Sequence, residues 1–176
     1  MPTTIVGATV HDAPNYITIA YIGIVNHNPP VIALGMGKSH YTNQGIKAHG
    51  TFSVNIPSQE MLTVTDYVGL FSGKTRDKGK LFTSFYGKLE TAPMIEECPL
   101  NLECRLIKTV DLDGTNDVFM GEIVATYTDD RYLTNNLPDI KKMNPVVFSM
   151  HDNTYWAIGE HLGKAWSLGR AYGKDS

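Results

Sequence analysis

The sequence has little cysteine, no excess of positive charge and no long apolar run. Only two of its 176 residues are cysteine, and 15 Lys and Arg stand against 18 Asp and Glu, which gives a net charge of −3. A chain with this balance has no general attraction for a phosphate backbone, so we expect no nucleic-acid partner. The longest apolar run, Tyr16–Val25, is about half as long as a membrane-spanning helix, so we expect no membrane span.

Targeting signals and local catalytic motifs are also missing. The chain begins without the basic flank and apolar run of a secretory signal, and we expect a cytoplasmic protein. The histidines and cysteines lack the spacing of a metal site, and Ser149, His151 and Asp152 lack the glycine turn of a hydrolase nucleophile. We therefore expect no metal and no catalytic side chain, and chemistry carried by a bound cofactor.

The two cysteines, Cys98 and Cys104, lie six residues apart in what we interpret as one strand. An even separation points both thiols to one face, but too far apart to form a disulfide. We predict that both are reduced.

The composition favours one folded domain over residues 1–176. Apolar residues make up 42% of the chain, which can bury a core, and a domain typically has roughly 100–200 residues. Turn residues bound several segments rich in β-branched and aromatic side chains. These segments are predicted strands: Thr4–Val10, Tyr16–Val25, Val31–Met36, Thr51–Ile56, Leu100–Val110, Val118–Tyr127, Val146–Met150 and Tyr155–Ile158.

Helices are predicted to be few and short. Tyr41–His49 is one candidate, with Ser39 or Thr42 as N-cap, and Ser58–Gly69 is another, capped by Ser58. A last amphipathic segment, Leu162–Tyr172, contains Trp166. Many short strands with few helices favour an antiparallel barrel over a doubly wound parallel sheet.

Two loops carry hydroxyl and cationic side chains suited to phosphate. The first, Lys38–Thr42, stands where a strand passes into a helix, and the second is Ser72–Lys78. Free backbone N–H groups at a helix start bind anions, so both loops together could hold one phosphorylated ligand. The alternatives are a helix cap for the first loop and a solvated surface loop for the second.

Neither loop matches a known nucleotide motif in full. Gly35-Met-Gly37-Lys-Ser-His40 has the context of a dinucleotide fingerprint, but His40 replaces its third glycine. Gly37-Lys38-Ser39 and Gly73-Lys74-Thr75 lack the earlier glycine of a P-loop.

An ordered set of segments nevertheless resembles the flavin reductase-like, FMN-binding split-barrel family, and its flavoredoxin branch most closely. The matching segments span about residues 3 to 127 and are Pro14–Tyr21, Asn28–Val31, Lys38–Thr42, Phe52–Pro57, Thr65–Gly69 with Ser72-Gly73 and Asp77-Lys78, and Gly121–Val124.

The resemblance implies a mainly β fold: a six-stranded antiparallel split β-barrel with a few short flanking helices. It also implies a homodimer that binds FMN near the subunit interface. Backbone amides of the segment beside the flavin ring would stabilise charge on the reduced cofactor. The residues implied to bind FMN are Thr18, Ile19, Ala20 and Tyr21 along the ring, and Ser39, His40, Tyr41, Thr42, Asn55, Ile56, Ser72, Gly73, Lys74 and Lys78 along the ribityl phosphate.

The function implied by the resemblance is that of a flavin-dependent oxidoreductase or electron carrier. Its electron donor would be NAD(P)H or a small redox protein. Thr115–Asp117 lacks the histidine that many flavin reductases carry at the corresponding place. Tyr155, Trp156 and Trp166 could cover the ring or pack in the core. The alternative function is a non-catalytic split-barrel protein that binds flavin, haem or another phosphorylated ligand.

Overall fold

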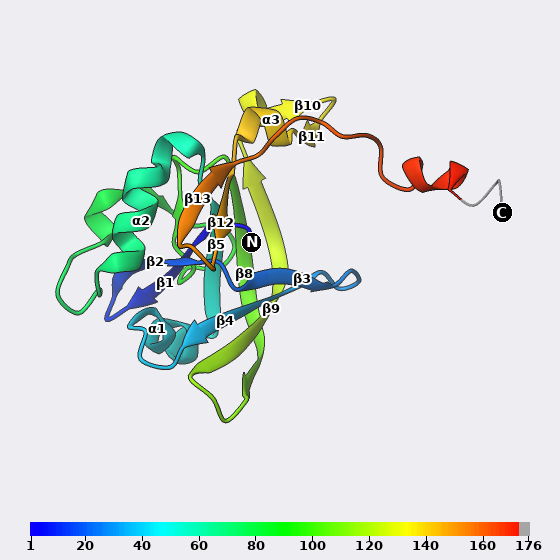
Figure 1. The fold of residues 1–176 in the computed structure, drawn as a ribbon. Helices are drawn as coiled ribbons and strands as arrows, with labels where there is room; N and C mark the ends of the chain where they lie inside the picture. The colour runs from blue at the N-terminus through cyan, green and yellow to red at the C-terminus, as the bar shows by residue number, and fades with distance from the viewer. Residues whose placement is uncertain (173–176) are drawn as a thin grey trace.

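The computed structural model describes residues 1–172 and consists mainly of antiparallel β-strands (Figure 1). The strands are β1 (Thr4–Val10), β2 (Ala13–Ile19), β3 (Ile22–Asn26), β4 (Val31–Gly37), β5 (Thr51–Ile56), β6 (Ser84–Phe85), β7 (Met94–Ile95), β8 (Leu100–Asp111), β9 (Asn116–Thr128), β10 (Leu133–Thr134), β11 (Leu137–Pro138), β12 (Val146–Ser149) and β13 (Thr154–Ala157). The helices are α1 (Thr42–His49), α2 (Leu62–Leu70) and α3 (Ile140–Met143).

Seven strands form one antiparallel sheet in the order β2-β1-β5-β8-β9-β4-β3. Its two edge strands, β2 and β3, follow each other in the chain and are separated only by Ala20 and Tyr21. The sheet must therefore curl until its edges meet at this connection, which makes it a split barrel. The mainly β, split-barrel prediction is confirmed.

The predicted number of six strands needs a correction. Tyr16–Val25 was expected as one strand, but the structure divides this region into β2 and β3, which pair with β1 and β4 on opposite edges. Neither Ala20 nor Tyr21 is a turn signal, so nothing in the local sequence reveals the break. This break lies beside the main cavity described below.

Strand β1 is buried along its whole length because both of its faces are covered. Val6 and Ala8 point into the barrel, where they join a core that includes Phe52 and Phe119. Ile5 points to the other face and joins a second core. This second core fills the space between the sheet and α2, and so holds α2 against β2.

The predicted helices are present, but their predicted caps are wrong. Tyr41 precedes α1 without capping it through its side chain, and Thr42 instead accepts a hydrogen bond from Asn15. Ser58 precedes a short 3-10 turn, Gln59–Met61, and makes no side-chain cap bond. Among the described residues, no helix is long and apolar enough to cross a membrane.

Both cysteines are free and buried, but they do not share a strand face. Cys98 precedes β8 and belongs to the core under α2, whereas Cys104 lies within β8 and faces the barrel interior. Burial raises the pKa of both thiols well above the usual value, so neither is an activated nucleophile.

The C-terminal arm, residues 159–172, leaves the body after β13 and projects away from it (Figure 1). Its only regular element is a 3-10 turn, Leu168–Ala171, so the amphipathic segment predicted at Leu162–Tyr172 buries no apolar face. Trp166 is 94% exposed. A core position for this tryptophan is therefore excluded.

Candidate functional site

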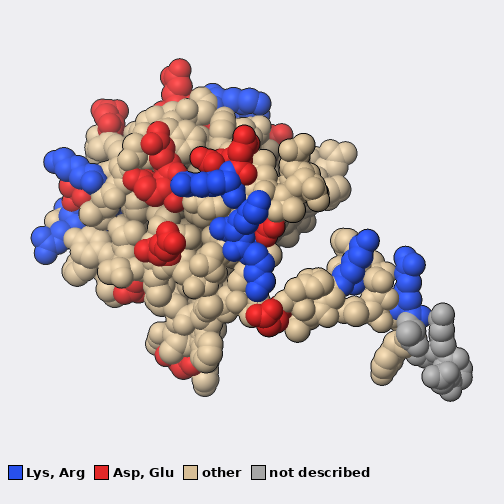
Figure 2. All heavy atoms as spheres, turned by 90° about the horizontal axis from the view of Figure 1, so that it is seen from above, with Lys and Arg blue, Asp and Glu red and all other residues tan. Residues whose placement is uncertain are grey.

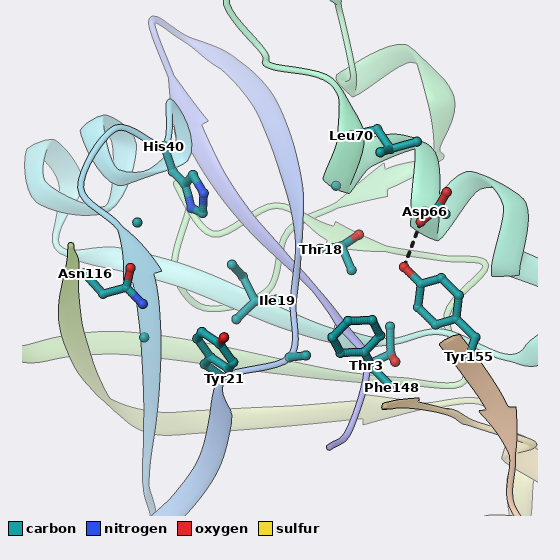
Figure 3. Close-up of a pocket in the computed structure, with 14 residues that line it drawn as sticks. Thr3, Thr18, Ile19, Tyr21, His40, Asp66, Leu70, Asn116, Phe148 and Tyr155 are labelled. Atoms are coloured by element: carbon teal, nitrogen blue, oxygen red, sulfur yellow. Dashed lines mark hydrogen bonds between the residues drawn. The ribbon is translucent and has the colours of Figure 1, made fainter. Parts of the chain in front are cut away.

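A cavity of about 390 Å³, which we call the ring cavity, lies where the sheet is split (Figure 3). The predicted segment Thr18–Tyr21 forms one part of its wall. The other lining residues come from five regions of the chain and are Thr3, Gly35, Gly37, His40, Asp66, Gly69, Leu70, Asn116, Phe148 and Tyr155. A cavity of this size with mostly apolar walls suits a planar organic ligand.

The break between β2 and β3 leaves hydrogen-bond donors at the ring cavity. Within residues 1–172, the backbone N–H groups of Ala20 and Tyr21 donate to no protein acceptor. The carbonyl groups of these two residues do accept hydrogen bonds, since Ala20 O accepts from Ile22 N and Tyr21 O accepts from Gly35 N. Two unpaired amides beside an apolar cavity can stabilise negative charge on a ligand.

Glycines leave two parts of the cavity wall without side chains. Gly35 and Gly37 alternate along β4 with the buried Met36, so both turn their backbone to the cavity. A Cβ atom on Gly37 would lie 3.1 Å from Nε2 of His40, and one on Gly69 would lie 3.1 Å from Cβ of Thr18. The glycines that resembled an incomplete dinucleotide fingerprint thus make room beside the barrel edge.

The two loops predicted to hold one phosphorylated ligand do face a common cavity. This second cavity, the anion cavity, has a volume of about 210 Å³. Ser39, His40 and Tyr41 line it from the first loop, and Ser72, Gly73 and Lys78 from the second. Ile17, Gly69, Leu70 and Phe71 complete its wall.

Gly73 allows the second loop to approach the first. A Cβ atom at residue 73 would lie 2.0 Å from Oδ1 of Asn15 and 2.6 Å from Cδ1 of Tyr41. Asn15 is itself fixed, because its side-chain amide donates to Thr42. Only glycine permits this close approach, which brings the hydroxyl of Ser72 towards the loop that begins α1.

Lys78 is a buried cation in the wall of the anion cavity. Its side chain is almost fully buried, and Nζ donates to the carbonyls of Val68 at 3.0 Å and Phe71 at 2.9 Å. It forms no ion pair within the described part of the chain. Burial lowers the pKa of this lysine to about 8, because no carboxylate offsets the loss of water.

The ring cavity and the anion cavity are continuous, since His40, Gly69 and Leu70 line both. His40 stands at this junction, and its buried Nδ1 has no hydrogen-bond partner among the described residues. Burial, and then the charge of Lys78, lower the pKa of His40, so the imidazole is neutral near pH 7. A neutral imidazole with a free ring nitrogen can hydrogen-bond a polar ligand at this point.

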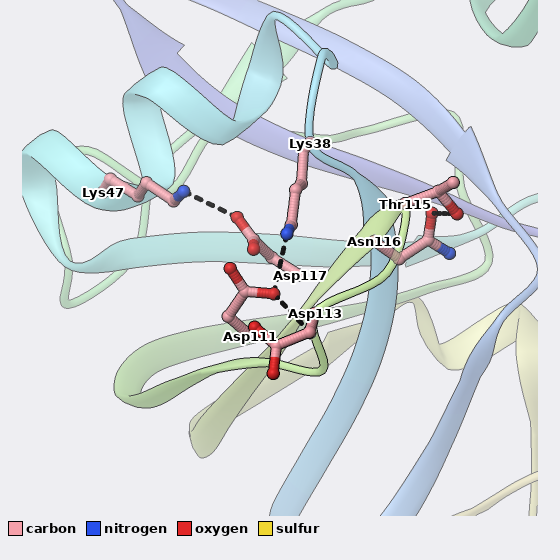
Figure 4. Close-up of polar contacts among 7 residues, drawn as sticks. All are labelled: Lys38, Lys47, Asp111, Asp113, Thr115, Asn116 and Asp117. Atoms are coloured by element: carbon pink, nitrogen blue, oxygen red, sulfur yellow. Dashed lines mark hydrogen bonds and ion pairs between the residues drawn. The ribbon is translucent and has the colours of Figure 1, made fainter.

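Some predicted site residues lie elsewhere. The side chain of Lys38 forms an ion pair with Asp111 on the β8–β9 hairpin, with 2.7 Å between Nζ and Oδ1 (Figure 4). Lys74 lines a neighbouring cavity of about 360 Å³ that shares Tyr41, Gly73 and Lys78 with the anion cavity. Thr42 is buried beneath the loop and bonded to Asn15.

The structure does not bring Asn55 and Ile56 to either cavity. Asn55 is fully buried in β5, where its side-chain amide donates to Ile5 O at 2.8 Å and its Oδ1 accepts from Ile95 N at 3.2 Å. Its hydrogen-bonding capacity serves the packing between β1, β5 and β7. Asn55 therefore has a structural role in this chain.

Several lining residues did not emerge from the sequence. Thr3, Asp66 and Phe148 carry no local signal, because distant elements bring them to the cavity. Asn116, whose side chain lines the cavity in Figure 3, stands in the segment that lacks the family's histidine. Tyr155 lines the cavity, where it could cover a bound ring. Trp156 is 59% exposed and belongs to no core.

Comparison with known proteins agrees with the fold and with the resemblance seen in the sequence. The flavin reductase like domain matches residues 1–149. A flavoredoxin from Methanosarcina acetivorans is 48% identical with a TM-score of 0.94, and the match covers 97% of this chain and 91% of that one. A flavoredoxin of Desulfovibrio vulgaris is 35% identical with a TM-score of 0.89, covering 96% and 92% of the two chains.

A third relative carries a named activity. An FMN reductase (NADH) of Rhizobium rhizogenes is 25% identical over 107 residues, which is 60% of this chain and 60% of that protein. The domain match covers most of the chain, including the barrel sheet and every residue that lines the two cavities except Tyr155. This chain therefore belongs to the flavin reductase-like family.

Proposed function

We propose that this protein binds FMN without a covalent bond and acts as a flavin-dependent oxidoreductase or electron carrier. The phosphate of FMN would lie in the anion cavity, its ribityl chain would pass His40, and its ring would enter the ring cavity. The names of the relatives, two flavoredoxins and an FMN reductase, support this cofactor. FMN, when bound, supplies the reversible uptake of electrons.

The observation that carries the proposal is the buried Lys78 beside a cavity that continues into the ring cavity. A buried cation without an acidic partner is costly, and a phosphate group would offset that cost. The hydroxyls of Ser39 and Ser72 line the same cavity and can donate to phosphate oxygens. The ring end, by contrast, is apolar and bordered by glycine.

The residues at the ring end fit a ring that becomes negatively charged on reduction. The free amides of Ala20 and Tyr21 can donate to it, which favours the reduced state without a titrating side chain. Leu70 and Phe148 contribute apolar side chains to the wall of the cavity. The chain's own role is thus to bind the cofactor, orient it and adjust its reduction potential.

We also propose that the protein works as a homodimer, with NAD(P)H or a small redox protein as electron donor. Four large apolar side chains of the C-terminal arm are more than two-thirds exposed: Leu162, Trp166, Leu168 and Tyr172. Figure 2 shows the arm standing clear of the body. An exposed apolar arm of this kind is suited to pack against a second copy.

The cofactor proposal is tested by replacing Ser39 and Ser72, which line the anion cavity from the two loops, together with alanine. Titration with FMN, followed by flavin fluorescence, should show an affinity at least about tenfold lower, since charge-assisted hydrogen bonds contribute about 1.5–3 kcal/mol each. Riboflavin, which lacks the phosphate, should bind both proteins equally. The control is Lys80→Ala, because Lys80 pairs with Asp77 at 3.0 Å and lines neither cavity. Unchanged FMN affinity in the double variant would mean that both loops have a structural role and do not bind the phosphate.

A further inference from the structure

The β12–β13 hairpin forms a wall of the ring cavity without belonging to the barrel sheet. It is a separate two-stranded sheet, and Phe148 and Tyr155 are its contributions to the cavity. Its strand β12 is held by the N-terminus, because Thr3 N donates to Val146 O at 3.1 Å and Phe148 N donates to Met1 O at 2.8 Å. The hairpin turn is also attached to the body, because the hydroxyl of Tyr21 donates to Sδ of Met150 at 2.9 Å.

Strand β13 has a single side-chain hydrogen bond to the barrel and its helices within residues 1–172. The hydroxyl of Tyr155 donates to Oδ1 of Asp66 on α2 at 2.8 Å, and both residues line the ring cavity (Figure 3). Burial, with the adjacent carboxylate, raises the pKa of Tyr155 to about 12. The phenol therefore keeps its proton and donates across the whole neutral pH range.

This bond fixes the position of an aromatic wall. Tyr155 contacts Phe148 across the hairpin, with ring centroids 5.6 Å apart. Gly35, Gly37 and Tyr21 line the same cavity, so a bound ring would contact both these residues and the hairpin. Tyr155 also lies beyond residues 1–149, so membership of the family assigns it no role.

We propose that the Tyr155–Asp66 hydrogen bond is a latch that holds the hairpin over the ring cavity and sets how long a flavin stays bound. The inference rests on the proposed flavin binding. With the latch closed, the ring leaves only after the hairpin separates from α2. The latch therefore favours a cofactor that is retained between turnovers over one that is exchanged as a substrate.

The latch is tested with Tyr155→Phe and Asp66→Leu, which remove the donor and the acceptor of this bond and keep a side chain of similar size. Stopped-flow displacement of bound flavin should show a dissociation rate at least about tenfold higher in each variant, as expected for loss of a hydrogen bond to a charged group. The double variant should dissociate no faster than either single variant, because all three lack the same bond. Tyr86→Phe is the matched control, since Tyr86 is exposed and lines neither cavity.

A comparison of FMN with riboflavin separates the latch from a general loss of structure. The latch acts at the ring, so the dissociation rates of both flavins should rise by the same factor. A rate in Tyr155→Phe equal to that in Tyr86→Phe would overturn the latch, as would an effect on FMN alone. If the unmodified protein bound neither flavin, the proposed function would fail instead.

Discussion

At the scale of single residues, Lys78 should make the affinity for a phosphorylated flavin depend on pH. Its pKa of about 8 in the free protein should rise when a phosphate dianion lies beside it. FMN should thus bind best below about pH 8 and lose up to about tenfold in affinity per pH unit above it, because binding then requires uptake of a proton. Titrations from pH 7 to 9.5, with riboflavin as the control, measure this slope; parallel slopes for both flavins would contradict it.

The stability of the ligand-free protein should change with pH in the opposite direction. Unfolded Lys78 keeps its proton up to its ordinary pKa of 10.5, whereas the folded protein releases it near pH 8. Between these values the unfolded chain binds more protons, so the contribution of Lys78 to the free energy of unfolding rises with pH. Below pH 8 both states are protonated and the cost of burying the charge is present in full.

Candidate site residues could be predicted from the sequence where the side chains of a single loop indicate which ligand the loop suits. Ser39, Ser72 and Gly73 were expected at a phosphate site, and the structure places them on one cavity. Asn55 could not be assigned in this way. An asparagine in a strand looks the same in the sequence whether it binds a cofactor or, as here, satisfies buried backbone groups.

At the scale of elements, the proposed homodimer gives the C-terminal arm a role in the interface between the two copies. Deleting residues 159–176 should raise the dissociation constant of the dimer at least about tenfold, because exposed aromatic side chains carry much of the energy of an interface. Sedimentation of the full-length and shortened proteins over a range of concentrations measures this change. Lys164→Ala is a control that keeps the apolar side chains. An unchanged dissociation constant would show that the arm does not contribute to the interface.

The bounds of the strands can be predicted from the local sequence, because the alternation of apolar side chains and the turn residues are signals that extend over only a few positions. The observed bounds of β1 and β5 equal those predicted, Thr4–Val10 and Thr51–Ile56. The division of Tyr16–Val25 into β2 and β3 could not be seen, because both halves are equally β-forming. What divides them is closure of the barrel, which requires each half to pair with a different neighbour.

At the scale of the whole molecule, the site depends on contacts between residues far apart in the chain. Tyr155 and Asp66 are separated by 89 positions, and no local pattern connects them. Loop chemistry predicted that the two loops share one ligand, and the resemblance to a family added Thr18–Tyr21 to the same proposed site. The sheet curls until its edges meet, which brings these segments to two continuous cavities.

The central claim, a flavin held for electron transfer, is tested most directly by the visible absorption spectrum of the purified protein. After reconstitution with FMN and removal of free cofactor, we expect flavin bands near about 370 and 450 nm, which belong to the cofactor rather than the chain. These bands should bleach under anaerobic conditions with NADH, NADPH or a reduced redox protein, and the effective reagent identifies the donor. Bands that none of these donors bleaches would indicate a flavin-binding protein without turnover. A protein that retains no flavin would contradict the proposed function.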